Sequence, residues 1–142
     1  MKASELMIGD WVCYNKPNGY VTQVQEVRHT SDGEEWYITC NRDKRDPLTE
    51  KAPSDSFNVE ILSEIPITEE ILETNGFQRS GSNFLMSDDY FDIIIDELTD
   101  SIWDLQYTNC EMDIGHQQMC FCHVHELQHA LRMCGMELEI KL

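Results

Sequence analysis

Five residues near the end of the sequence form a pattern that zinc hydrolases use. His125-Glu126-Leu127-Gln128-His129 is an H-E-x-x-H sequence. Residues four positions apart share one face of a helix, so His125 and His129 could bind one metal ion while Glu126 serves as general base for a metal-bound water. On a helical wheel the two imidazoles lie about 40° apart, opposite the apolar stripe of Val124, Leu127, Leu131 and Cys134. That position suits a metal site in a cleft, and it equally suits a solvent-exposed helix face.

The sequence offers no clear third ligand for this motif. The extended motif needs a glycine and a third histidine, but Arg132 and Gly135 stand at those positions. The other common arrangement takes a glutamate from a second helix downstream. Only 13 residues follow His129, and they predict a turn and a strand, so Glu137 or Glu139 would have to serve. A zinc-dependent hydrolase is therefore an alternative and not the main interpretation.

A second group of metal-binding residue types directly precedes the motif. Cys120 and Cys122 would place both thiols on one face of a strand, and His123, His125 or His129 could complete the set of ligands. Structural zinc sites usually draw their ligands from two separated pairs, and this chain offers one. Two half-buried thiols leading into a helix explain the same residues. We expect no resident cofactor, with zinc as the alternative.

The elements that must position these residues follow from periodicity and from turn residues. A helix is predicted over 124–134, where Gly135 ends it, and the alternation over 137–142 predicts a terminal strand. A shorter helix begins after Thr68 and stops at Asn75-Gly76. Strands are predicted over 84–86, 90–95 and 102–107, although 92–96 could equally be helical. A turn is expected to end at Gly115, followed by a strand or loop through Cys122.

The first part of the chain contains strand signals and no helix signal. Strands are predicted over 10–14, 20–27, 36–40 and 57–65, with a loop over 41–56. The three-residue spacing of Val21, Val24 and Val27 indicates an irregularity in the second strand. We therefore expect an α+β fold, with an N-terminal SH3-like small β-barrel over 1–66 followed by an α-β-β-β-α-β lobe over 67–142.

Charge excludes several classes of function. The 142 residues carry 27 acidic and 10 basic side chains, a formal net charge of −17. Residues 1–66 hold 12 acids and 7 bases, whereas 67–142 hold 15 acids and 3 bases, so −12 of the total belongs to the second lobe. Such a chain repels phosphates, which argues against direct nucleic-acid binding and against anionic membranes. A partner for the acidic lobe should be basic.

The compartment is inferred from the cysteines and from the hydropathy pattern. The sequence shows no secretory signal and no apolar stretch long enough to span a membrane. Its six cysteines are therefore expected to be reduced thiols, and we expect the protein in the cytoplasm.

Three blocks of the sequence resemble a family of small uncharacterised proteins of gut Bacteroidetes, some associated with prophages or mobile elements. The blocks are 1–12 (MKASELMIGDWV), 65–77 (IPITEEILETNGF) and 124–131 (VHELQHAL). In similar sequences the last block resembles His-x-Leu-Gln followed by Asn or His, with the glutamate not fixed. The resemblance implies that Leu127 and Gln128 serve packing and helix positioning, and it weighs against an enzyme.

Together these observations favour a non-enzymatic protein-interaction module. The barrel-like first lobe, the incomplete catalytic set and the acidic second lobe all point in this direction. Two alternatives remain open at this stage, a zinc hydrolase centred on His125, Glu126 and His129, and an acidic mimic of nucleic acid that occupies a basic partner.

Overall fold

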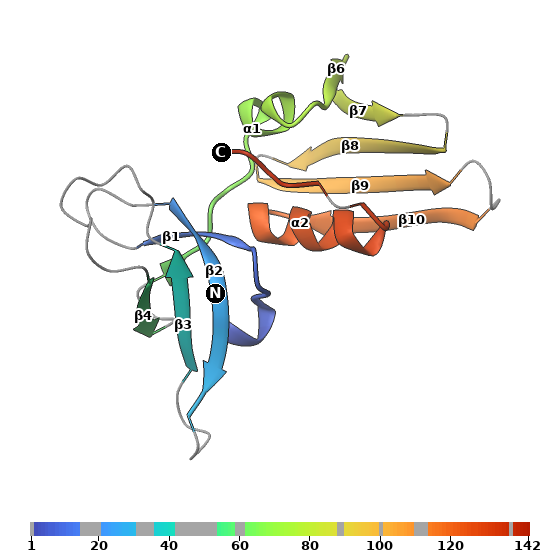
Figure 1. Ribbon diagram of the computed structural model, residues 1–142. Coiled ribbons are helices and arrows are strands. Elements are labelled where there is room, and N and C mark those ends of the chain that lie inside the picture. Colours follow the sequence, from blue (N-terminus) through green and yellow to red (C-terminus); the bar gives the residue numbers. More distant parts are fainter. Residues whose placement is uncertain are drawn as a thin grey trace. The chain divides into compact units, whose positions relative to one another are not determined.

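The chain folds into two compact units, Met1–Ile65 and Pro66–Leu142 (Figure 1). The computed structural model describes residues 2–14, 21–30, 36–41, 54–58, 62–87, 90–99, 101–109, 114–136 and 138–142. The fold is α+β, with two antiparallel sheets and few helices. Among the described residues, no helix has the length and apolar composition needed to cross a bilayer.

The first unit is a curled five-stranded antiparallel sheet. It contains η1 (Ala3–Glu5), β1 (Trp11–Tyr14), β2 (Val21–His29), β3 (Trp36–Asn41), β4 (Ser54–Asn58) and β5 (Leu62–Ser63), in the sheet order β4-β3-β2-β1-β5. The last strand returns to pair with the first. The register of β2 against β3 shifts between Val24 and Glu26, which is the irregularity that the valine spacing indicates. Such a bulge increases local twist and helps a sheet to curl.

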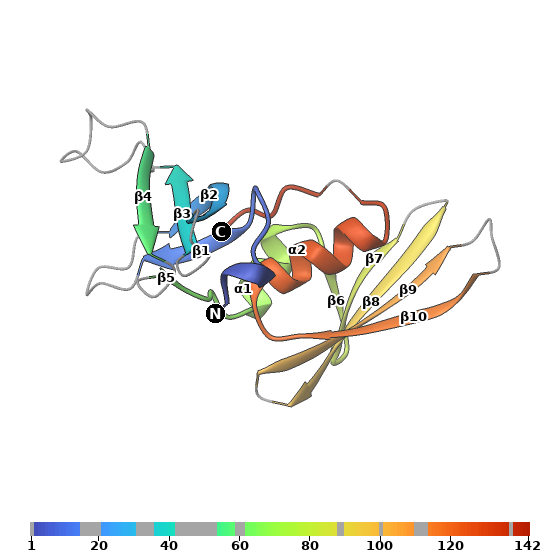
Figure 2. The ribbon, with the colours of Figure 1, turned by 90° about the horizontal axis from the view of Figure 1, so that it is seen from below.

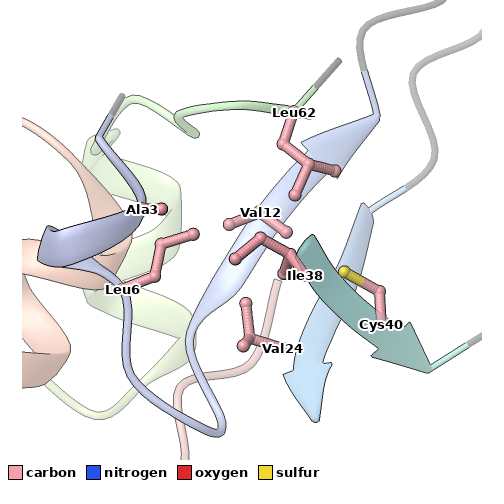
Figure 3. Close-up of a cluster of buried hydrophobic side chains, with 7 residues drawn as sticks. All are labelled: Ala3, Leu6, Val12, Val24, Ile38, Cys40 and Leu62. Atoms are coloured by element: carbon pink, nitrogen blue, oxygen red, sulfur yellow. The ribbon is translucent and has the colours of Figure 1, made fainter. Parts of the chain in front are cut away.

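A small apolar core lies inside this curled sheet (Figure 3). Val12, Val24 and Ile38 come from three adjacent strands and are fully buried. The remaining members are Ala3 in η1, Leu6 directly after it, Cys40 in β3 and Leu62 in β5. Residues far apart in the sequence therefore meet in one cluster, which closes the sheet around them.

The second unit is a five-stranded antiparallel sheet with two helices. It contains α1 (Glu69–Thr74), β6 (Gln78–Ser80), β7 (Asn83–Ser87), β8 (Phe91–Thr99), β9 (Ile102–Asn109), β10 (Ile114–Phe121) and α2 (Val124–Met133). The sheet order is β10-β9-β8-β7-β6, a simple meander. Helix α2 lies along one face of this sheet (Figures 1 and 2). Large apolar side chains on that face are buried, among them Phe84, Ile93, Ile95, Trp103, Leu105 and Phe121.

Both helices end where the local sequence indicates. The Thr68 hydroxyl accepts a hydrogen bond from the backbone N–H of Ile71 at 3.3 Å and caps the start of α1. Gly76 follows with φ of 91°, the left-handed conformation that ends many helices. Gly135, with φ of 80°, ends α2 in the same way.

Three sequence-based expectations for this unit are wrong. The sheet has five strands, whereas three strands and a terminal strand were expected, because the short β6 and the long β10 pair with it. The turn that was expected to end at Gly115 ends earlier, because β10 already begins at Ile114. The described residues 138–142 form no strand.

The C-terminal segment is held by a side chain instead of a sheet partner. The Asn75 side-chain amide donates to the Lys141 carbonyl at 2.8 Å, and its oxygen accepts from the Lys141 N–H at 2.7 Å. The same amide also donates to the Ile71 carbonyl at 2.7 Å. The Asn75 side chain thus satisfies the N–H and C=O groups of Lys141, which in a strand would bond to a neighbouring strand. Ile140, which precedes Lys141 in the sequence, is fully buried.

Candidate functional site

The H-E-x-x-H motif lies on the first turns of α2, but not on an exposed face. His125 is only 2% exposed and His129 is half-buried, so of the two positions that the motif suits, a solvent-exposed helix face does not apply to His125. Over its first two turns α2 has buried side chains on opposite sides of the helix. These buried residues are Val124, His125, Leu127, Gln128, Ala130 and Leu131. A wheel drawn from hydropathy alone assigns one buried stripe and cannot detect a second one.

Three imidazoles lie in succession at this end of the helix. The ring centroids of His123 and His125 are 5.9 Å apart and nearly parallel, and those of His125 and His129 are also 5.9 Å apart but nearly perpendicular. The structure therefore brings the two motif histidines close together. Within the part of the chain that the structure describes, no group of three or more His, Cys, Asp or Glu side chains is arranged to hold a metal ion.

Glu126 is occupied by the helix start. Its Oε2 accepts hydrogen bonds from the backbone N–H groups of Cys122 at 2.7 Å and His123 at 3.0 Å, and it lies 3.2 Å from the His123 Nδ1. Glu126 is the third residue after the N-cap His123, so it reaches back as the acid of a capping box does. Burial alone would raise the pKa of this carboxyl, but the two backbone bonds and the nearby imidazoles outweigh it and lower the pKa below its ordinary value.

The two cysteines before α2 differ in environment. Cys120 is exposed, and its thiol lies 3.8 Å from Oδ1 of Asp104 on the neighbouring strand. Cys122 is half-buried at the end of β10, and its carbonyl accepts from the Ile67 N–H at 3.1 Å.

The two residues that the family resemblance singles out are both inside the protein. Leu127 is fully buried and Gln128 is 4% exposed. The side-chain amide of a buried glutamine must find its hydrogen-bond partners within the protein.

Sequence reasoning missed the second face of the β6–β10 sheet. Side chains alternate across a strand, so the registers place one set opposite to the core: Gln78, Ser80, Asn83, Leu85, Ser87, Asp92, Ile94, Asp96, Asp104, Gln106, Thr108, Gln118 and Cys120. We call this set the open face. Every member except Asp104 is exposed or only half-buried.

A hydrogen-bond network runs across the open face around Asp104, which is 1% exposed. Its Oδ2 accepts from the Gln118 Nε2 at 2.9 Å and from the Gln106 Nε2 at 3.4 Å. Gln106 also donates to Oδ2 of Asp96 at 3.3 Å. Two carboxylates on adjacent strands are therefore joined through one neutral amide. The available sequence signal was the run of three isoleucines between Asp92 and Asp96, but it does not reveal which face of the strand is covered.

A groove of about 460 Å³ lies at one end of the opposite, core-bearing face. It is lined by Phe91, Tyr107, Asn109, Cys134, Gly135, Met136 and Leu138. The rings of Phe91 and Tyr107 stack with centroids 6.5 Å apart. No lining residue carries a formal charge, so the groove does not indicate a class of ligand.

Comparison with known proteins gives no significant match to this chain among family models, curated proteins or solved structures.

Proposed function

We propose that this protein is a non-enzymatic protein-interaction module. The observation that carries the proposal is the open face of the second unit, where a five-stranded sheet bears α2 on one side and presents exposed and half-buried side chains on the other. Antiparallel sheets commonly leave one face to solvent, but such faces are then mainly polar. Here apolar Leu85 and Ile94 lie side by side in the register, in the middle of the face.

The state of Glu126 supports the non-enzymatic part of the proposal. A general base must accept a proton from a metal-bound water, and it needs a free lone pair directed at that water. Oε2 of Glu126 already accepts two backbone hydrogen bonds. A hydrolase that used Glu126 would have to break the start of its own helix or rely on the other oxygen alone.

Metal analysis tests this part of the proposal against the zinc-hydrolase alternative. The full chain, purified without a histidine tag, is dialysed against zinc and its metal content is measured, alongside His129→Asn. We expect less than about 0.2 zinc per chain in both proteins and an unchanged fold in the variant. About one zinc per chain in the wild type, lost in His129→Asn, would establish the alternative.

For the first unit we propose an SH3-like barrel. Its support is the strand order β4-β3-β2-β1-β5, in which the last strand returns to the first around one small core. We also propose a cytoplasmic location, in which the six cysteines would be kept as reduced thiols.

A further inference from the structure

We infer that the open face of the β6–β10 sheet binds a basic amphipathic helix of a partner protein. This inference rests on the proposed function and names the class of partner. It follows from three properties of the face, which are its exposure, its charge and the spacing of its acidic and apolar side chains.

The side chains of the open face are accessible on each strand, except for Asp104 on β9, which is buried. Asp92 on β8 and both Gln118 and Cys120 on β10 are exposed, and Leu85, Ile94 and Asp96 are half-buried. These residues belong to three of the five strands of one continuous sheet. A partner could therefore lie across several strands.

The face is acidic without basic side chains. It holds Asp92, Asp96 and Asp104, and none of its members is lysine or arginine. Arg79 of the neighbouring β6 lies on the other side of the sheet, over the Phe84 ring and 2.6 Å from a Glu69 carboxylate oxygen. Within the part of the chain that the structure describes, the hydrogen bonds to Asp104 come from two neutral amides and a thiol. A cationic partner would complement this arrangement.

The spacing on β8 specifies more than charge. Asp92, Ile94 and Asp96 all point to the open face, so an apolar side chain lies between two carboxylates. Four residues of strand place the two carboxylates about 13 Å apart. In a helix, basic residues seven or eight positions apart lie on one face and span about 10–12 Å. An apolar residue of the partner helix, one turn away from each of these two basic residues, would contact Ile94.

A second copy of this chain is a poor occupant of the same face. Each copy carries a net charge of −17, and a symmetric contact would bring acidic faces together. Charge complementarity therefore selects a basic partner over self-association.

The inference is tested with a helical peptide of about 18 residues, with lysine and leucine in an amphipathic pattern, and with its partner peptide in which glutamate replaces lysine. Binding of each labelled peptide to the full chain is measured by fluorescence anisotropy. We expect the lysine peptide to bind, with affinity that falls as salt rises, and the glutamate peptide not to bind.

Two double variants of equal charge separate this face from general attraction to an acidic protein. Asp92→Asn with Asp96→Asn removes two carboxylates from the open face, whereas Glu70→Gln with Glu73→Gln removes two exposed carboxylates from α1. We expect the first pair to weaken binding of the lysine peptide about five- to tenfold and the second pair by less than about twofold.

The apolar contribution has its own control. Ile94→Thr keeps a β-branched residue in the strand but removes part of the apolar surface, and we expect it to weaken binding about fivefold. Met133→Ser on α2 removes a side chain that is 71% exposed elsewhere and should leave binding unchanged. Circular dichroism of each variant verifies that it is folded.

Three outcomes would overturn the inference. One is equal weakening by the two charge pairs, which would assign binding to net charge. Another is absence of binding by the lysine peptide. The third is self-association of the free chain that Asp92→Asn with Asp96→Asn abolishes, which would assign the face to a second copy. None of these outcomes depends on the zinc content of the protein. A failure of the docking inference can therefore be distinguished from a failure of the proposed non-enzymatic function, which metal analysis tests.

Discussion

Replacing Glu126 distinguishes a capping residue from a catalytic one. Glu126→Ala removes the acceptor of two backbone hydrogen bonds, from Cys122 at 2.7 Å and from His123 at 3.0 Å. Hydrogen bonds to a charged group contribute about 1.5–3 kcal/mol each when buried. The Glu126 side chain is 42% exposed, so water competes for both donors and each bond contributes less than this range. Capping substitutions cost about 0.5–2 kcal/mol, and we therefore expect a loss of about 1.5 kcal/mol.

Urea unfolding followed by far-ultraviolet circular dichroism measures this loss, since both α-helices belong to the second unit. Glu126→Gln keeps an oxygen acceptor without the charge and should lose roughly half as much. Glu73→Ala, an exposed glutamate of α1, is the matched control and should change the unfolding free energy by less than about 0.5 kcal/mol.

The dependence on pH has a defined sign. The pKa of Glu126 is lower in the folded protein than its ordinary value of 4.5, so its carboxylate stabilises the fold above that pH. The contribution is lost as pH falls through the lower, folded value. The difference between wild type and Glu126→Gln should be full at neutral pH and shrink in acid. If Glu126→Ala matches Glu73→Ala in stability at neutral pH, the assignment of Glu126 as a capping residue is refuted.

Three further predictions concern other parts of the molecule. Asn75→Ala should destabilise the second unit by about 2–3 kcal/mol in urea unfolding, because it removes both hydrogen bonds to the Lys141 backbone. The backbone amide of Lys141 should then exchange its hydrogen faster, and an unchanged exchange rate would contradict the stabilising role of Asn75. Gly76→Ala should lower the free energy of unfolding by about 1 kcal/mol, because the φ of 91° is unfavourable for alanine. The added Cβ would lie at an ordinary contact distance of 3.7 Å from the Met86 Cε, so the loss would come from the backbone conformation. An unchanged melting temperature would contradict this prediction. Burial raises the pKa of the Cys40 thiol to about 11, so Cys40 should resist thiol reagents at neutral pH while the exposed Cys120 reacts. Mass spectrometry identifies the labelled cysteines, and rapid labelling of Cys40 would argue against its burial.

Local signals predicted the ends of the helices well. The Thr68 cap and the Asn75-Gly76 stop bound α1, and the apolar spacing with Gly135 bounds α2. These interactions involve residues within four positions of each other, so the sequence contains both partners. The predicted strand at 36–40 likewise appears as β3, between stretches rich in turn residues.

The site was harder to predict because its state depends on distant residues. The H-E-x-x-H pattern is visible in the sequence, but the burial of His125 depends on what packs around α2. The capping role of Glu126 does have a local signal, because Glu126 stands three residues after His123, the position of the acid in a capping box.

By itself, the sequence determined the acidity of the second unit and the limits of the two helices. Only the tertiary structure decided which residues form the open face, because strand register joins Asp96, Asp104 and Cys120 from three separate strands. It also decided that residues 138–142 form no strand, since Asn75, 66 positions before Lys141, provides the hydrogen bonds. Periodicity reports which side chains share one face of an element, whereas pairing between elements determines whether that face is covered.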